Sequence, residues 1–381
     1  MLSNGGCDSM RAMPMKQWKS PWFANIQPPN PNRPKYVPSQ DPSVRMLQYE
    51  EFCSENGEIK QLLQSTFTNS FRKGYVRTRE VCLPEYYKDF GDQILDMDVK
   101  DDDVWVCSFP KTGTTWTQEM AWCIANDLDF EGAKVFLPER FPFLEHTPLF
   151  DYRNNLEMQQ QVLPPYVLDS VKHISNLPGR RFIKAHLPFR LLPQKIQDGS
   201  TKAKIIYVTR NPKDTCVSYF HHCQLLEGYK GNFEDFFKIF LDGLVCFGPF
   251  WSHVLEFWEA SKTNPNILFL KYEDMKKDLI SVIHQTTEFL NKKLSSDQID
   301  ILAKHLSFES MKNNRATNYE VVIEINKENN LIDKEKCETG SFMRSGKIGG
   351  WKALMTNEMS DQIDLWSKQS LIGSPDFSFT S

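Results

Sequence analysis

Residues 104–116 read VWVCSFPKTGTTW, and this stretch decides the fold. Its apolar run up to Phe109 predicts a buried strand, and the helical pattern of residues 116–122 follows a turn of small residues. A strand, a tight turn and a helix start together form a phosphate cradle, because N–H groups at a helix N-terminus face an anion that the helix dipole also favours. Lys111 adds a positive point charge, and Gly113 allows the backbone to approach closely.

This turn differs from a Walker A loop. That motif needs a lysine directly after its second glycine, together with a hydroxyl that binds magnesium. Here Lys111 precedes Gly113 by two positions. An ordinary tight turn is therefore the alternative interpretation, and further segments must decide between the two.

Two such segments place polar residues at the ends of predicted strands. In residues 181–188, RFIKAHLP, Lys184 and His186 are two positions apart and project to the same side of an extended chain. Arg210 follows a predicted strand over residues 205–209, at the end where open α/β sheets bind ligands. Ser218 lies near that end on the next predicted helix. These positions favour a phosphate site.

Together with later motifs, these segments resemble the cytosolic sulfotransferases, which use 3′-phosphoadenosine-5′-phosphosulfate (PAPS). The resemblance runs from about Phe71 to Leu371 and implies a single α/β domain with a central, mostly parallel sheet flanked by helices and a P-loop-like phosphosulfate-binding loop. We expect this domain over residues 46–381, after a flexible, basic, proline-rich extension over residues 1–45. The matching segments, in the family's order, are residues 108–116, 184–188, 207–219, 269–274, 307–314 and 342–352.

Charge and cysteine usage exclude several classes of protein. Residues 1–45 carry six Lys/Arg and two Asp, so the remaining residues carry 39 Lys/Arg against 47 Asp/Glu, a net charge of −8. That balance argues against general nucleic-acid binding. The nine cysteines show no CxxC spacing, and no stretch approaches the roughly 18 apolar residues of a membrane span. We therefore expect a cytoplasmic protein without a membrane span.

The resemblance implies a role for each matched residue. His186 is the expected general base for the acceptor hydroxyl, and Lys184 the group that stabilises the equatorial sulfonyl oxygens. Lys111 would contact the bridging oxygen and the departing phosphate, and Ser218 would restrain this lysine until the acceptor arrives. No metal is required. The expected PAPS-binding residues are Lys111, Thr112, Gly113, Thr114 and Thr115 at the 5′-phosphate, Arg210, Ser218, Arg344, Ser345 and Gly346 at the 3′-phosphate, and Trp116, Tyr272 and Phe308 at the adenine.

The acceptor site is expected to be apolar. Phe141 and Phe143 resemble the family's acceptor-pocket segment, and His222 and His186 are expected to face the same pocket. Residues 132–179 predict a long, aromatic-rich loop over it, longer than is usual in the family. A metal site at residues 221–223 is disfavoured, because neighbouring positions on a helix do not converge.

The leading hypothesis is transfer of a sulfonyl group from PAPS to a small apolar alcohol or phenol. The N-terminal extension and the long pocket loop also resemble retinol dehydratase, in which sulfonation of an allylic alcohol is followed by loss of sulfate. A catalytically inactive nucleotide- or lipid-binding member is a further alternative. Ser345 stands where the family usually has lysine, which predicts weaker 3′-phosphate binding. The segment after Trp351 lacks the family's dimerisation pattern, so the oligomeric state stays open.

The remaining pattern predicts the other elements. Residues 46–64 predict an amphipathic helix, and residues 75–103 predict loops before the first core strand. We expect a helix over residues 233–259 that is interrupted near Gly248, and a polar, mobile segment over residues 313–341 near the site. A further strand is expected over residues 267–272, with helices over residues 278–290 and 297–306.

Overall fold

The computed structural model describes residues 47–51, 57–154, 163–329, 331–332 and 340–379. The extension expected over residues 1–45 lies outside this part of the chain. The predicted helical interruption is present, since α11 (Phe233–Leu241) and α12 (Phe250–Thr263) are separate helices. No helix among the described residues is both long enough and apolar enough to cross a membrane.

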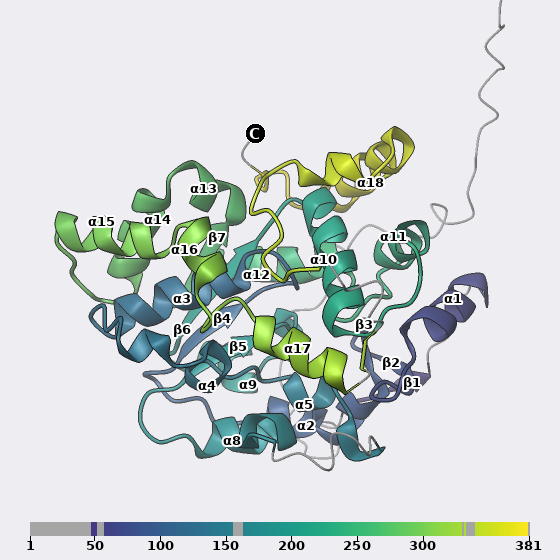
Figure 1. Cartoon of the computed structure of the whole chain (residues 1–381), viewed down its shortest axis with the longest axis horizontal. Helices are drawn as coiled ribbons and strands as arrows, with labels where there is room; N and C mark the ends of the chain where they lie inside the picture. Colours follow the sequence, from purple (N-terminus) through teal and green to yellow (C-terminus); the bar gives the residue numbers. More distant parts are fainter. Residues whose placement is uncertain (1–46, 52–56, 155–162, 330, 333–339, 380–381) are drawn as a thin grey trace, which may run out of the picture.

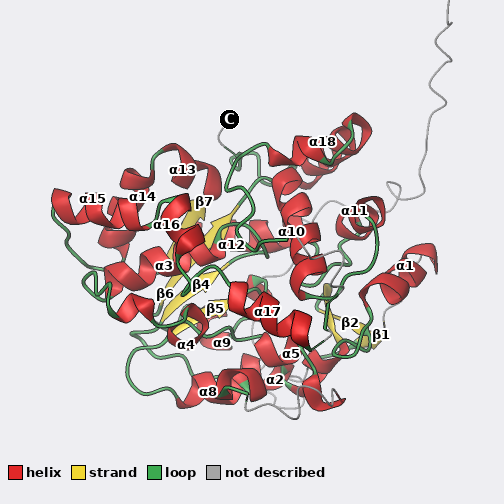
Figure 2. Cartoon of the chain, viewed as in Figure 1, coloured by secondary structure: helices red, strands yellow, loops and turns green. Residues whose placement is uncertain are grey.

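Four parallel strands in the order β5-β4-β6-β7 form the central sheet, which Figure 2 shows in yellow between helices. The register pairs Val106 of β4 with Lys184 of β5 and Ile206 of β6. This sheet confirms the predicted α/β fold. The strands are β4 (Val104–Cys107), β5 (Phe182–Ala185), β6 (Lys204–Thr209) and β7 (Ile267–Lys271).

Alternation along β4 and β6 supplies two apolar cores, one on each face of the sheet. Trp105 and Tyr207 belong to one core, whereas Val106 and Ile206 belong to the other. The first core also holds α10 (Pro212–Leu226), α11 and α12. The second holds α3 (Thr114–Ala125), α14 (Leu279–Phe289) and α15 (Ser296–His305), so helices cover both faces (Figure 1).

A second, antiparallel sheet corrects the prediction of loops over residues 75–103. It contains β1 (Glu50–Glu51), β2 (Tyr75–Thr78) and β3 (Val81–Pro84), followed by η3 (Glu85–Asp89) and α2 (Gly91–Leu95). Arg79 and Glu80 turn the hairpin with φ of 44° and 64°. Such turns usually carry Asn-Gly or Asp-Gly, so the sequence offered no hairpin signal. The helix predicted over residues 46–64 is likewise wrong at its start, since α1 is Gly57–Phe67.

Two segments that were expected to be irregular contain helices. The described residues between 132 and 179, which leave out 155–162, contain η4 (Gly132–Lys134), α4 (Leu137–Arg140), α5 (His146–Leu149), η5 (Tyr152–Asn154), α7 (Pro165–Leu168) and α8 (Ser170–Asn176). The polar segment after residue 313 contains α17 (Glu320–Glu328), whose Ile323 packs with Leu225 and Leu226 of α10. The other elements are η6 (Phe189–Leu191), α9 (Gln194–Gln197), α13 (Tyr272–Lys277), α16 (Phe308–Asn313), η7 (Gly350–Ala353) and α18 (Asn357–Ser370).

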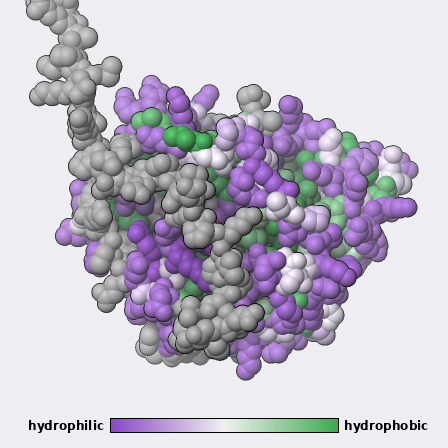
Figure 3. Space-filling view, turned by 180° about the vertical axis from the view of Figure 1, so that it is seen from behind, coloured by the Kyte–Doolittle hydropathy of each residue, from purple (hydrophilic) through white to green (hydrophobic). Residues whose placement is uncertain are grey.

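The face opposite to that of Figure 1 is mostly hydrophilic, with apolar side chains gathered in small groups (Figure 3). The apolar residues of the described part are instead concentrated in the two cores beside the central sheet. Open parallel sheets bind ligands at the carboxyl ends of their strands, so the functional site is expected where the loops leave the central sheet.

Candidate active site

The loop between β4 and α3 is held in a fixed shape by one side chain. Thr112 Oγ1 lies 2.8 Å from both the Phe109 and the Val208 carbonyl oxygens, so this hydroxyl ties the loop to β6. Lys111 and Gly113 have φ of 68° and 115°. A Cβ on Gly113 would also lie 3.0 Å from the Tyr272 ring, which explains why glycine stands here.

A cavity of about 540 Å³ opens above this loop and brings together almost all predicted site residues. Two of them do not line it. The Thr112 side chain is fully buried beneath the loop, and Phe141 is buried in the core, 5.5 Å from the Phe182 ring. The predicted residues that line the cavity are Lys111, Gly113, Thr114, Thr115, Trp116, Phe143, Lys184, His186, Arg210, Ser218, His222, Tyr272, Phe308, Arg344, Ser345 and Gly346.

Phe141 is therefore misplaced by the sequence prediction. Phe141 directly follows α4, and its N–H donates to the carbonyl of Leu137 in that helix. The Phe141 ring belongs to the core that includes α3. Phe143, two residues further on, bridges to Lys184 of β5 and lines the cavity. Of this aromatic pair, only Phe143 is placed to touch an acceptor.

His186 follows β5 and has one ring nitrogen occupied. Its Nδ1 lies 2.7 Å from the Ser108 carbonyl oxygen, which can only accept, so Nδ1 carries the proton and Nε2 keeps its lone pair. Burial, with the nearby Lys184 charge, lowers the pKa of His186 well below its usual value. The imidazole is therefore neutral at pH 7 and is able to accept a proton.

Two buried groups that the sequence did not identify hold the backbone of His186. The Glu145 carboxylate accepts bonds from the N–H groups of His186 (3.1 Å) and Leu187 (3.0 Å). His253 Nε2 lies 2.8 Å from the His186 carbonyl oxygen, and Tyr207 Oη lies 2.9 Å from His253 Nδ1. Glu145 comes from a distant loop and His253 from α12, so sequence spacing gives no signal of either contact.

Two lysines, Lys111 and Lys184, line the same cavity as this imidazole. Lys111 Nζ lies 3.7 Å from the centroid of the Phe342 ring, and Lys184 Nζ lies 4.2 Å from that of Phe143. Burial is the main cause that lowers the pKa of Lys111 to about 7, with the Lys184 charge adding to it. Burial also lowers the pKa of Lys184 to about 8. Such crowded cations fit an anionic ligand, which would restore their charge.

Arg210, which follows β6, and Arg344 form a second cationic group in the cavity lining. Arg210 donates from Nη2 to the Lys347 carbonyl (2.8 Å) and lies over the Tyr272 ring, 4.5 Å from its centroid. Its Nε is buried and has no hydrogen-bond partner among the described residues. Burial, and then the Arg210 charge, lowers the pKa of Arg344. These two guanidinium groups fit a phosphate.

Aromatic rings complete this end of the cavity. Trp116 and Tyr272 meet edge to face, with their ring centroids 5.6 Å apart. Gly346 has φ of 60°, and a Cβ there would lie 2.3 Å from the Phe308 ring. Glycine therefore lets the chain pass directly beside Phe308. Trp116 and Phe308 both line the cavity, as a base-stacking role requires.

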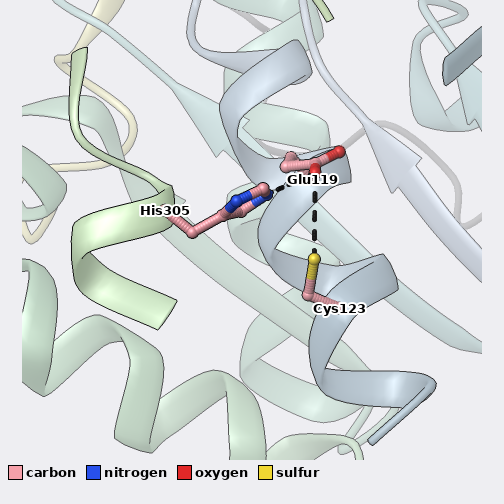
Figure 4. A group of neighbouring side chains, drawn as sticks. All are labelled: Glu119, Cys123 and His305. Atoms are coloured by element: carbon pink, nitrogen blue, oxygen red, sulfur yellow. Dashed lines mark hydrogen bonds and ion pairs between the residues drawn. The ribbon is translucent and has the colours of Figure 1, made fainter. Parts of the chain in front are cut away.

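Glu119 and Cys123 of α3 and His305 of α15 form a separate cluster of potential metal ligands, none of which lines the cavity (Figure 4). His305 Nε2 is 2.7 Å from Glu119 Oε1, and Cys123 Sγ is 3.8 Å from the same oxygen. Arg140 forms an ion pair with the other Glu119 oxygen, and burial raises the pKa of the Cys123 thiol. Because the carboxylate is already neutralised and the thiol stays protonated, the cluster fits a structural network that joins α3, α4 and α15.

The cavity at the ends of the parallel strands, with Lys111, Lys184 and Arg210 in its lining, fits an anionic ligand. The family model described as the sulfotransferase domain matches residues 101–375 of this chain. The chain therefore belongs to the sulfotransferase family. This confirms the family that the sequence resembles.

Individual relatives agree with this assignment. The chain is 44% identical over 319 residues to luciferin sulfotransferase of Photinus pyralis, covering 83% of this chain and 85% of the relative. It is 33% identical over 294 residues to sulfotransferase 1E1 of Bos taurus, covering 76% of this chain and 90% of the relative. The structure of retinol dehydratase in complex with retinol and PAP superposes with a TM-score of 0.77 at 33% identity, over 88% of this chain and 99% of that one.

Proposed function

We propose that this chain transfers a sulfonyl group from PAPS to the hydroxyl of a small apolar alcohol or phenol, with His186 as general base. The observation that carries this proposal is the bond of His186 Nδ1 to the Ser108 carbonyl, which leaves the lone pair on Nε2, while His186 lines one cavity with Lys111 and Lys184. The structure of retinol dehydratase with PAP supports the choice of nucleotide.

PAPS supplies the sulfonyl group, and PAP is the product that remains. In this scheme His186 Nε2 takes the proton of the acceptor hydroxyl as its oxygen bonds to sulfur and the bond from sulfur to the phosphate oxygen breaks. Lys184 stabilises the equatorial sulfonyl oxygens, and Lys111 stabilises the charge on the departing phosphate. Ser218 lines the same cavity, where it would restrain Lys111 until the acceptor arrives.

The residues of the nucleotide end fit PAPS. The loop from Lys111 to Thr115 would bind the 5′-phosphate at the N-terminus of α3. Arg210, with its unpartnered Nε, would bind the 3′-phosphate together with Ser218, Arg344, Ser345 and Gly346. Trp116 and Phe308 would stack on the adenine, and Tyr272 would bond its edge. This scheme uses no metal.

The acceptor end fits an apolar alcohol or phenol. Its wall includes Leu149, Phe150, Tyr166, Val167 and Phe247, which come from short helices and loops far apart in the chain. Phe143 and His186 would contact the acceptor near the reacting oxygen. We propose the cytoplasm as the location, which agrees with six described cysteines that are buried and unpaired.

A dehydratase outcome is the second candidate function. It is favoured by the similarity to retinol dehydratase, whose structure with androsterone and PAP also superposes on this chain with a TM-score of 0.75. An inactive binding member is disfavoured, because Lys111, Lys184 and His186 all line one cavity.

Incubation with ³⁵S-labelled PAPS and a panel of phenols, sterols and retinoids tests these alternatives. A sulfotransferase yields labelled sulfate esters, and a dehydratase yields free labelled sulfate with an acceptor that has lost water. If the protein binds PAP but no acceptor changes, the proposed function is wrong.

A further inference from the structure

His222 is a second imidazole in the cavity that the proposed reaction leaves without a chemical role. It lies on α10, one turn beyond Ser218, and lines the cavity with a side chain that is 20% exposed. Its ring neighbours are Tyr219 and Phe342, with centroids 6.0 Å away in both cases. A polar ring among such neighbours calls for a partner.

One side of this ring faces a buried charge pair. His222 Nε2 lies 3.4 Å from Glu227 Oε1, and the other Glu227 oxygen lies 2.7 Å from Arg72 Nη1. The side chains of Arg72 and Glu227 are 0% and 4% exposed. Burial alone would raise the pKa of Glu227, but the adjacent Arg72 charge and His222 hold it at about 2. The carboxylate therefore stays ionised and can only accept hydrogen bonds.

This carboxylate selects the tautomer of His222. Because Glu227 can only accept, the proton of the neutral ring belongs on Nε2, and Nδ1 keeps its lone pair. Burial lowers the pKa of His222 to about 4, so the ring is neutral at pH 7. Nδ1 is buried and has no hydrogen-bond partner in the described part of the chain. A buried acceptor of this kind gains free energy when a ligand donates to it.

His146 is the other cavity histidine with a buried, unpartnered Nδ1. Its closest described ring contact is Phe150, at 5.2 Å between centroids, and no described carboxylate faces it within ion-pair distance. Its tautomer is thus not fixed in the way that Glu227 fixes that of His222. Of these two histidines, only His222 therefore has a ring acceptor that a neighbouring carboxylate assigns to Nδ1.

Resting on the proposed function, we propose that His222 selects acceptors that carry a second hydrogen-bond donor besides the hydroxyl that receives the sulfonyl group. Diols and hydroxyalkyl phenols form this substrate class. The donor hydrogen reaches His222 Nδ1, while the reacting hydroxyl faces His186 Nε2. Glu227 is a positioning residue that acts through His222, and Arg72 neutralises its charge.

Three phenols whose para chains have the same length but different end groups distinguish this proposal from general apolar recognition. The chains end in a hydroxyl, a methoxy group or a methyl group, so only the first can donate. Each phenol is titrated by calorimetry into the full chain saturated with PAP, over chains of three to six carbons. At the best length, we expect the hydroxyl probe to bind about tenfold more tightly than the methoxy probe.

Variants assign this preference to one side chain. In His222→Phe the three phenols should bind within about twofold of one another, because no acceptor atom remains. His222→Asn, whose Oδ1 can replace Nδ1, should restore part of the preference. Glu227→Gln should reduce it, whereas a merely structural role would weaken all three phenols alike. His221→Phe is the matched control, since this neighbouring histidine does not line the cavity and should keep the preference.

Equal binding of the hydroxyl and methoxy probes by the wild-type chain at every length would overturn the proposal. A preference that survives in His222→Phe would overturn it as well. Sulfonyl transfer to the methyl-ended phenol, measured separately with labelled PAPS, reports on the proposed function alone. Failure of that function and failure of the His222 assignment are therefore distinguishable.

Discussion

The two ends of the cavity are built in different ways. The nucleotide end uses residues at the ends of parallel strands or in the turns that follow them, such as Lys111 after β4 and Arg210 after β6. The acceptor end is formed by α5, α7, α10 and α17, and these helices include pairs that are far apart in the sequence. A strand end fixes a side chain by the register of the sheet, whereas the acceptor wall depends on the packing of short helices. We therefore expect nucleotide-end substitutions to change PAPS use without changing acceptor choice.

The largest expected effect lies where the two ends meet, at Lys184. Lys184→Met should lower kcat by about 10²- to 10³-fold, because a cation directed at developing sulfonyl charge is lost. PAP affinity should fall far less, since PAP lacks the sulfonyl group. Kinetics with labelled PAPS and calorimetry with PAP measure the two effects. Lys172→Met, an exposed position on α8, is the control, and an equal loss in kcat and PAP affinity would assign Lys184 to binding alone.

Arg210→Ala should weaken PAP by about tenfold to a hundredfold, as expected for a charge-assisted bond to phosphate. Adenosine 5′-phosphate, which lacks the 3′-phosphate, should lose little. Titration of both nucleotides into this variant and into Arg315→Ala, an exposed control, gives the comparison. Equal losses for both nucleotides would remove Arg210 from the 3′-phosphate site.

The pKa of Lys111 predicts a pH effect of intermediate size. Burial holds this pKa at about 7 in the free protein, and a bound phosphate raises it, because opposite charge favours the protonated lysine. PAP affinity should therefore fall as the pH rises above 7, by at most about tenfold per unit. Below pH 7 Lys111 is already charged and contributes no slope.

Calorimetry at pH 8 in buffers of different ionisation enthalpy measures this proton uptake directly. Lys111→Met should reduce it, and the uptake that remains belongs to Lys184, whose pKa of about 8 a bound anion also raises. If the wild-type chain took up no proton at pH 8, Lys111 would not be the group that meets the phosphate.

Ser345→Lys should give the smallest effect, a severalfold tightening of PAP, because a partly exposed ion pair contributes only a little free energy. Added salt should reduce the gain. Ser345→Gln provides a neutral side chain of similar reach, so a gain of the same size in this variant would show that charge is not its cause.

That the predicted PAPS-site residues would line one cavity could be anticipated, because they occur in contiguous motifs, two of which follow strands β4 and β6. Gly113 and Gly346, for example, stand where positive φ and close ring contacts require glycine. The contacts of Glu145 with His186 and of Arg72 with Glu227 were not predictable, since these partners are 41 and 155 positions apart. The position of Phe141 was not predictable either. Phe141 and Phe143 belong to the same aromatic segment, but the Phe141 ring packs into the core whereas Phe143 lines the cavity.

The predictions of the hairpin and of the segment before α17 failed where the backbone departs from the preference of its residues. Arg79 and Glu80 adopt positive φ without the glycine or asparagine that usually marks such a turn. The segment before α17 likewise turns at Tyr319, which has φ of 59°. In both places tertiary packing overrides the intrinsic preference of the residues, as it often does where neighbouring elements are buried together.

In the proposed reaction, His186 activates the acceptor hydroxyl for transfer from PAPS. Single-turnover incubation with ³⁵S-labelled PAPS and a para-alkyl phenol tests it most directly, with the wild-type chain and His186→Ala compared at equal occupancy by nucleotide. We predict a labelled phenyl sulfate from the wild-type chain and a rate at least about 10²-fold lower from the variant, with PAP affinity nearly unchanged. Transfer at similar rates by both proteins would show that His186 is not the general base.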